Sequence, residues 1–367
     1  MKRIVLSGVN LAEMGPIRIY EEALRAAVDL FEGGYEIVAI VHRKELFAVP
    51  GVRYLEFPGI RKSWLRRLSF EYLQLKPLSK ELNADLWLSM HDITPNVEAR
   101  RRAVYCHNPA PFYSLRLRDA LISWKFAAFV LFYGYLYGIN IRKNDTVIVQ
   151  QDWIRREFKM RYAPGNIVVA HPAVDEARTG PEIPDLPSSD GVYRFFYPAF
   201  PRPFKNFEVV LEATSILERE SVHAFEVWLT LDARTNRYAN ATVSKYRHLD
   251  CVKWLGILDH AMVREGYRRT DCLLFPSRLE TWGLPITEFK ETKRPMIVAD
   301  LPYARETVGT YDSVAFFNQD DPAQLAQLMK GAIYGDPVFE RAQAKAIAPP
   351  FARNWSELWK ILVHEAS

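Results

Sequence analysis

The chain has 367 residues, of which 49% are hydrophobic and 25% are charged. This length suits two folded domains, and the composition excludes an intrinsically disordered chain. The three cysteines are Cys106, Cys251 and Cys272, and their odd number and wide spacing exclude a disulfide framework and a zinc-binding motif. We therefore expect a reducing, cytoplasmic compartment.

Charge is unevenly distributed along the chain. Residues 1–178 hold 26 Lys and Arg against 19 Asp and Glu, and residues 179–367 hold 22 against 25. An anionic partner is therefore expected to meet only the basic first part. The longest nearly apolar stretch, residues 126–139, has 14 residues and is too short to span a bilayer. Neither a signal peptide nor a nucleic-acid-binding motif is recognisable, so we expect no nucleic-acid partner.

Short apolar strands alternate with helical periodicity along the first 170 residues. Strands are expected at residues 4–8, 35–41, 85–89, 103–106 and 146–149, and a helix at residues 17–30. Such alternation predicts a parallel α/β sheet with right-handed crossovers. Ligands of such sheets collect at the carboxyl ends of the strands.

The proline-rich residues 171–191 interrupt this pattern and predict a linker or hinge. The alternation then restarts, with strands expected at residues 193–197, 225–231, 252–255, 272–275 and 296–299, and helices at 207–218, 261–268, 285–292, 303–308 and 322–334. We predict one doubly wound domain over residues 1–170, a second over residues 192–350, and a C-terminal helical segment over residues 351–367.

The most informative segment comprises residues 271–288. A strand ends at Phe275, and a loop leads through Gly283 to a helix that begins near Pro285, a residue that suits the first helical turn. Backbone N–H groups at a helix start bind phosphate, and Gly283 lets an anion approach the backbone closely. Glu288, one turn further along, is predicted to accept hydrogen bonds from a ribose, and Glu280 lies on the loop where a sugar would bind.

Glu280 and Glu288, with Gly283-Leu284-Pro285 between them, resemble the signature of the large family of retaining GT-B glycosyltransferases. This family includes bacterial mannosyltransferases and sucrose-phosphate synthases. The resemblance implies two Rossmann-like domains facing across a cleft, with a nucleoside-diphosphate sugar bound by the C-terminal one. It places Trp282, Gly283, Leu284 and Glu288 at the donor and makes Glu280 catalytic.

Other segments resemble this family in the same order. Lys205 matches a lysine that binds the donor diphosphate, but the family's arginine six residues earlier is Ala199 here, and Arg202 is the alternative source of positive charge. Ile257 matches a strand end that contacts the nucleobase through its backbone. Gly15, before Pro16, matches only loosely a glycine loop near the donor.

Three polar residues follow strands of the first domain. The resemblance makes His107 the histidine that contacts the transferred sugar. His91 and Asp92 follow the strand at residues 85–89 and are candidates for the acceptor site. Each of the three side chains has the alternative of serving only the local structure.

The resemblance implies transfer of a hexosyl group, with retention, to a saccharide or lipid-linked saccharide in surface-polysaccharide assembly. The chain contains no Asp-x-Asp motif, so we expect no metal and no other cofactor, with Lys205 and backbone N–H groups stabilising the departing phosphate. The nucleotide, the sugar and the acceptor remain open. A nucleotide-sugar epimerase and a non-catalytic nucleotide-sugar-binding protein are the alternatives.

Two segments of the basic first part predict contact with an anionic membrane surface. Residues 61–80 carry six basic residues and one acidic residue, with apolar residues between them, as in a basic amphipathic helix lying on a bilayer. Residues 112–143 combine the apolar stretch with basic residues, namely Arg116, Arg118, Lys125, Arg142 and Lys143. The alternative is that these apolar side chains are core.

Overall fold

The computed structural model describes residues 2–11, 14–47, 49–113, 115, 124–172 and 190–364. Contacts divide the chain into two compact units. Among the described residues, unit 1 holds residues 2–113, 128–172 and 347–364, and unit 2 holds residues 190–346 together with residues 115 and 124–127. The predicted linker lies almost entirely outside the described residues.

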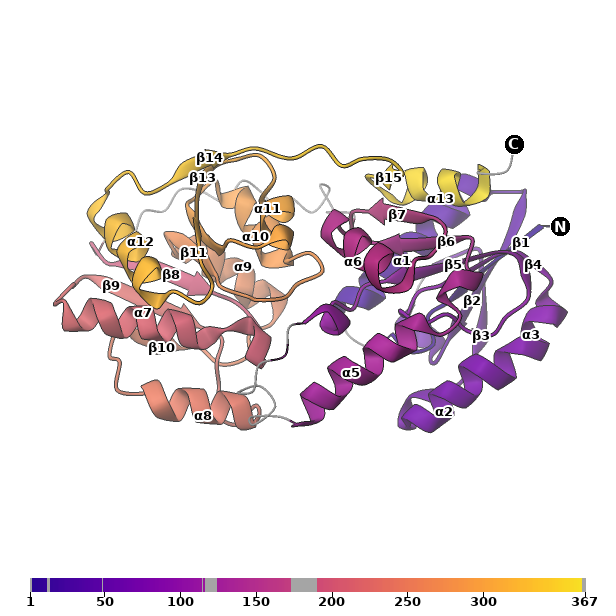
Figure 1. Cartoon of the computed structure of the whole chain (residues 1–367), viewed down its shortest axis with the longest axis horizontal. Helices are drawn as coiled ribbons and strands as arrows, with labels where there is room; N and C mark the ends of the chain where they lie inside the picture. The colour runs from indigo at the N-terminus through magenta and orange to yellow at the C-terminus, as the bar shows by residue number, and fades with distance from the viewer. Residues whose placement is uncertain are drawn as a thin grey trace. The chain divides into compact units, whose positions relative to one another are not determined.

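Unit 1 contains one parallel sheet and the helices that cover it (Figure 1). Its strands are β1 (Lys2–Ser7), β2 (Tyr35–Val41), β3 (Val52–Glu56), β4 (Ala84–Ser89), β5 (Ala99–Cys106), β6 (Thr146–Val149), β7 (Ile167–Ala170) and β15 (Phe351–Ala352). Its helices are α1 (Met14–Phe31), α2 (Trp64–Ser69), α3 (Leu75–Leu82), α5 (Trp124–Gly138), α6 (Asp152–Tyr162) and α13 (Trp355–His364), and a π-helical turn, η3 (Phe70–Gln74), joins α2 to α3.

The order of strands in this sheet is β15-β7-β6-β5-β4-β1-β2-β3. The chain therefore starts in the middle, moves outward through β2 and β3, and returns to the other side of β1 at β4. Every strand pair is parallel among the described residues. The loops that follow β1 and β4 consequently leave the same edge at the point where the direction of winding changes, which is where doubly wound sheets bind ligands.

Both faces of the first sheet are covered. Successive side chains of β1 point to opposite faces, so their neighbours show what packs on each face. Ile4 and Leu6 pack in the cluster that contains residues of α1 and Trp359 of α13. Val5 packs in the opposite cluster, with Phe70 and Leu75. Each strand buried on both sides therefore reads as a continuous apolar run, as expected for a parallel sheet.

Unit 2 repeats this architecture. Its strands are β8 (Tyr193–Tyr197), β9 (Phe225–Leu229), β10 (Val252–Trp254), β11 (Cys272–Phe275), β12 (Met296–Ala299), β13 (Tyr311–Phe317) and β14 (Glu340–Ala342). Its helices are α7 (Phe207–Arg219), α8 (Arg237–Tyr246), α9 (His260–Arg269), α10 (Leu284–Phe289), α11 (Pro302–Val308) and α12 (Pro322–Tyr334), with 3-10 turns η7 (Pro203–Lys205) and η8 (Lys290–Thr292).

The second sheet has the order β10-β9-β8-β11-β12-β13-β14, and only the pair β13 and β14 is antiparallel among the described strands. The winding direction changes between β8 and β11, which are hydrogen-bonded neighbours. The loop after β8 and the loop after β11 therefore leave the sheet side by side, although more than 70 residues separate them in sequence.

Most predicted elements are present, with ends that differ by at most four residues. The helix expected at residues 285–292 is shorter, because α10 ends at Phe289 and the turn η8 follows it. The prediction missed strands β3, β7, β13, β14 and β15 and, in unit 2, helix α8. In the part of the chain that the structure describes, no helix is long and apolar enough to span a membrane.

Candidate functional site

An ion pair joins the two loops at the winding change of unit 2. Lys205, in the turn η7 after β8, contacts the carboxylate of Glu280, in the loop after β11. Both side chains are largely buried, with 17% and 14% of their surface exposed. Two residues that the resemblance places at the donor thus lie in contact at the edge where such sheets bind ligands.

The backbone around Lys205 is held from several sides. The hydroxyl of Tyr197 donates to the carbonyl of Lys205 at 2.8 Å. Asn206, in the left-handed conformation with φ of 58°, is fully buried and donates from its side chain to the carbonyls of Pro276 and Gln319. Asn206 therefore ties the Lys205 turn to the loop that carries Glu280.

A left-handed glycine produces the turn between the two glutamates. Gly283 has φ of 86°, a conformation that favours glycine, and it caps the N-terminus of α10. Leu284, the first residue of α10, is 45% exposed. The indole of Trp282 is buried and donates to the Thr287 hydroxyl at 2.9 Å, which stabilises the turn, and its role at the donor stays a prediction.

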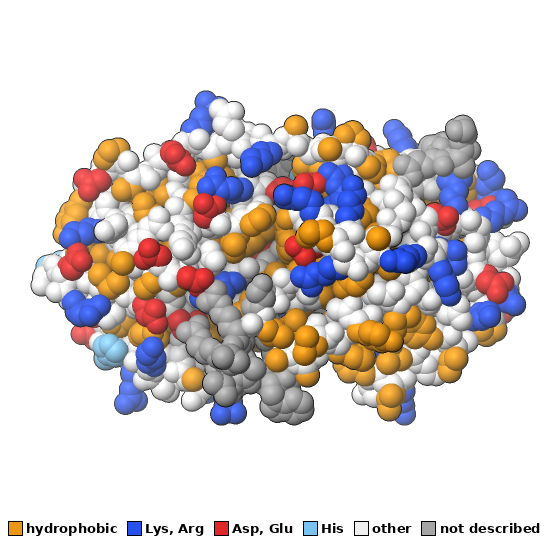
Figure 2. Space-filling model, in the orientation of Figure 1, with side chains coloured by type: hydrophobic (Ala, Val, Ile, Leu, Met, Phe, Trp, Pro, Cys, Tyr) orange, Lys and Arg blue, Asp and Glu red, His pale blue; other side chains and the backbone are white. Residues whose placement is uncertain are grey.

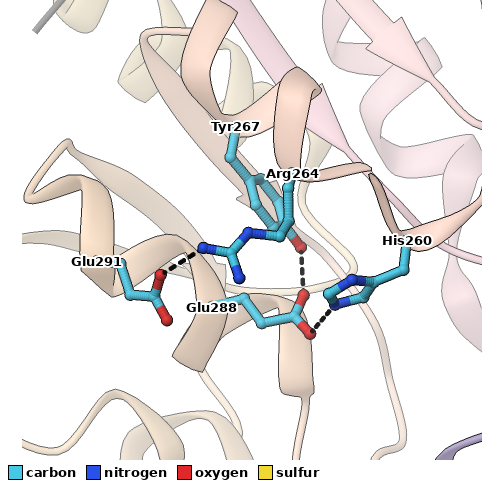
Figure 3. Close-up of a pocket in the computed structure, with 5 residues that line it drawn as sticks. All are labelled: His260, Arg264, Tyr267, Glu288 and Glu291. Atoms are coloured by element: carbon cyan, nitrogen blue, oxygen red, sulfur yellow. Dashed lines mark hydrogen bonds and ion pairs between the residues drawn. The ribbon is translucent and has the colours of Figure 1, made fainter. Parts of the chain in front are cut away.

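Glu288 faces helix α9 and lines a small pocket of about 220 Å³, open solvent included (Figure 3). Its carboxylate accepts a hydrogen bond from the Tyr267 hydroxyl at 3.0 Å and lies 3.4 Å from Nε2 of His260. Arg264 and Glu291 complete the lining and form an ion pair of 3.3 Å with each other. Neither Tyr267 nor His260 was a predicted site residue, and no motif in the sequence marks them.

The remaining residues expected at the donor also follow strands of the second sheet. The Arg202 side chain is exposed, and its guanidinium carbon lies 5.6 Å from the centroid of the Phe200 ring. Ala199, where the family has an arginine, is tied by its backbone to Thr230. Ile257 follows β10 and is 52% exposed. Their roles stay predictions.

In unit 1, Asp92 organises the loop that carries His107. One oxygen of the buried Asp92 carboxylate accepts from the backbone N–H groups of His107 and Asn108, at 2.7 and 3.0 Å. The hydroxyls of Tyr133 and Tyr137 also donate to this carboxylate. Asp92 itself has φ of 75°, a strained conformation for a residue other than glycine. The Asp92 side chain, which we expected at the acceptor, therefore makes its hydrogen bonds within this loop and to α5. The His107 side chain is 17% exposed.

His91 is not an accessible acceptor ligand. It is 1% exposed, and its Nε2 lies 3.2 Å from the Ser7 hydroxyl. Burial first, and then the nearby Arg67 guanidinium, holds the pKa of His91 well below its usual range, so the ring is neutral at pH 7. This burial does not favour the acceptor role that we expected for His91, and that role stays a prediction.

The predicted glycine loop is also displaced. Gly15 lies in the first turn of α1, where the fixed φ of the following Pro16 suits a helix start. The loop after β1 instead contains Gly8, where a Cβ would lie 2.7 Å from the ring of Tyr20. Gly8 therefore permits the close approach of α1 to the end of β1.

The amphipathic helix predicted at residues 61–80 is present from Trp64 to Leu82, where α2, the π-helical turn η3 and α3 follow one another directly, but part of its polar face is buried. Arg67 is buried and donates to the carbonyl of His91 at 3.0 Å, and Phe70 and Glu71 are buried as well. The exposed apolar side chains come from this segment (α2 and η3) and from α5, and the Trp64 and Phe132 rings have centroids 5.8 Å apart. This exposed apolar surface comprises Trp64, Leu65, Leu73, Leu131, Phe132 and Tyr135.

Figure 2 shows hydrophobic side chains gathered where α2 and α5 run in Figure 1. Three basic side chains, Arg61, Lys62 and Arg66, are exposed beside Trp64 in the sequence. Of the second predicted basic segment, Arg142 and Lys143 are exposed. Arg116 and Arg118 lie outside the described residues, as does the side chain of Lys125.

Comparison with known proteins bears on the second unit first. Residues 183–347 match the family model described as glycosyl transferases group 1. The three cysteines are free, and among the described residues no group of His, Cys, Asp or Glu is arranged to hold a metal ion.

One sequence match and several similar structures add to this comparison. A 92-residue stretch is 28% identical to the serotype-specific mannosyltransferase WbdA of Escherichia coli, and it spans 24% of this chain but only 11% of that protein. Sucrose-phosphate synthase from Thermosynechococcus elongatus has a similar structure, with a TM-score of 0.61 at 15% identity over 99% of this chain and 95% of that one. WaaG, a glycosyltransferase involved in lipopolysaccharide biosynthesis, gives 0.59 at 13% identity over 90% of each chain. The two-domain GT-B fold expected from the sequence is thereby confirmed.

Proposed function

We propose that this protein transfers a hexosyl group, with retention, from a nucleoside-diphosphate sugar to a saccharide or lipid-linked saccharide in bacterial surface-polysaccharide assembly. The observation that carries the proposal is the Lys205–Glu280 ion pair at the winding change of a group 1 glycosyltransferase domain. The relation to a mannosyltransferase and the likeness to a lipopolysaccharide glycosyltransferase support the choice of pathway class.

In the proposed reaction, the donor diphosphate replaces Glu280 as the partner of Lys205. Lys205, backbone N–H groups near Gly283 and Leu284, and Arg202 stabilise the negative charge that grows on the departing phosphate. Glu280, released from Lys205, accepts hydrogen bonds from hydroxyls of the transferred sugar. Glu288 accepts hydrogen bonds from the ribose. No metal is needed for this charge balance.

The chemical step exchanges one bond at the anomeric carbon. The bond from this carbon to the diphosphate oxygen breaks, with its electron pair leaving on the phosphate, and a bond to the acceptor oxygen forms on the same face. The acceptor proton passes to the departing phosphate, so no protein base is required. His107 is proposed to contact the transferred sugar.

The test combines donor binding with product analysis. UDP-, GDP- and dTDP-sugars are screened for thermal stabilisation, and the donor that binds is incubated with saccharide acceptors. NMR then reports whether the new glycosidic bond keeps the anomeric configuration of the donor. Isomerisation of the donor without acceptor would support an epimerase, and tight binding without any transfer would support a non-catalytic binding protein.

We further propose that the exposed apolar surface of unit 1 rests on an anionic membrane. Its apolar side chains can enter the interfacial region, while Arg61, Lys62 and Arg66 meet lipid phosphates, each contributing about 1 kcal/mol. A lipid-linked acceptor would then be reached at the membrane surface.

Co-sedimentation with vesicles of anionic and of neutral lipid tests the membrane proposal. We expect binding to anionic vesicles that weakens when Arg61, Lys62 and Arg66 are changed together to Glu. The matched control changes Arg234, Arg237 and Lys245 of unit 2 to Glu. Equal binding by both variants would contradict the proposal.

A further inference from the structure

Helix α9 holds the carboxylate that we assign to the donor ribose. In Figure 3 the Tyr267 hydroxyl and the His260 ring point at the two oxygens of Glu288. Tyr267 donates to Oε2 at 3.0 Å, and Nε2 of His260 lies 3.4 Å from Oε1. The glutamate lies on α10, so a second element determines how its carboxylate is oriented.

Tyr267 is a rigid donor. Its side chain is 1% exposed and packs against the rings of Phe196 and Phe289, with centroids 5.8 and 5.5 Å away. A Cβ on the preceding Gly266 would lie 2.6 Å from the Phe196 ring, so α9 approaches β8 as closely as a glycine allows. Burial first, and then the charge of Glu288, holds the pKa of Tyr267 well above its usual range, so its hydroxyl keeps its proton.

His260 is held less firmly than Tyr267. It is the first residue of α9, after the capping residue Asp259, and its side chain is 60% exposed. Arg264, which also lines the pocket, pairs with Glu291 on η8. The two contacts of Glu288 within the pocket therefore come from one buried hydroxyl and one exposed imidazole.

We propose that Tyr267, assisted by His260, is a positioning residue that orients the Glu288 carboxylate toward the vicinal hydroxyls of a ribose. This inference rests on the proposed nucleotide-sugar site. A vicinal diol donates two nearly parallel hydrogen bonds, which a carboxylate accepts together only in one orientation. A glutamate already held in that orientation loses less side-chain entropy when the ligand binds, so the ligand binds more tightly.

The test measures how much of the affinity depends on the ribose hydroxyls. Calorimetry compares UDP or GDP, whichever binds the wild type, with its 2′,3′-dideoxy analogue, in wild type and Tyr267→Phe. We expect the variant to raise the dissociation constant of the ribonucleotide about 3- to 10-fold. The dissociation constant of the dideoxy analogue should not change, because that ligand lacks the hydroxyls that Glu288 binds. His260→Ala should give the same pattern with a smaller change.

Tyr246→Phe is the matched control. Tyr246 is also buried and its hydroxyl also donates to a glutamate, Glu212, at 3.0 Å, on helices away from Glu288. This control should bind both ligands as the wild type does. If Tyr267→Phe weakens both ligands equally, or neither, the positioning role is overturned. If the wild type binds neither UDP nor GDP, or binds ribo and dideoxy forms alike, the proposed ribose contact fails instead.

Discussion

Replacing Glu71 by glutamine should stabilise unit 1, and increasingly so as the pH rises. Glu71 lies in the π-helical turn η3 and is fully buried. Among the described residues neither of its carboxylate oxygens has a hydrogen-bond partner, although Nε2 of the neutral His91 lies 3.2 Å from Oε1. Burial raises the pKa of Glu71 from 4.5 to about 8, against the opposing effect of the Arg67 guanidinium.

The size of the effect follows from proton linkage. Between pH 4.5 and about 8 the folded state keeps a proton on Glu71 that the unfolded state releases. The free energy of unfolding therefore holds its full contribution from this group below pH 4.5 and loses it as the pH rises through about 8. At about 1.36 kcal/mol per pKa unit, the loss is about 3 kcal/mol at neutral pH and about 4 kcal/mol near pH 8. Glutamine has the shape of the protonated acid without this dependence on pH.

Urea unfolding of wild type and Glu71→Gln over the range from pH 5 to pH 8 measures the difference. We expect the two free energies of unfolding to differ by less than about 1 kcal/mol at the acidic end and to diverge toward the basic end. Glu81→Gln, an exposed glutamate on the following helix, is the control for loss of a negative charge. Parallel curves for wild type and Glu71→Gln at every pH would refute the reasoning.

Three further outcomes are expected. Lys205→Ala should lower turnover about 10²–10³-fold in an activity assay, because one hydrogen-bond donor to the departing phosphate is lost. Lys330→Ala, which breaks an exposed Lys–Glu pair, is the control and should leave turnover unchanged. EDTA should leave the same activity unchanged, and a strict requirement for added Mg²⁺ or Mn²⁺ would contradict the proposed charge balance. Gly266→Ala should lower the free energy of unfolding by about 1–3 kcal/mol in denaturation experiments, because its Cβ overlaps the Phe196 ring, and unchanged stability would mean that α9 can shift.

Local sequence determined the class of fold and the turn between Glu280 and Glu288. The buried apolar runs at residues 4–6 of β1 and 195–197 of β8 are what strands covered on both faces require, and the alternation of strands and helices predicted two doubly wound units. The turn through Gly283 was predictable because its chemistry is confined to a few adjacent residues. The spacing of Glu280 and Glu288 around that turn was visible for the same reason.

Only the tertiary structure decided which of these side chains meet. Lys205 and Glu280 are 75 residues apart in sequence, and they touch because β8 and β11 are neighbours at the winding change. The order of strands in a sheet has no local signature, so the sequence could not place Tyr267 against Glu288. Burial has the same origin: Arg67 and His91 are polar residues in loop-like or amphipathic contexts, but they lie in the interior because the packing of α2 over the first sheet encloses them. A periodic pattern shows which face of an element is apolar, whereas the partner of a polar side chain depends on which elements the fold brings together.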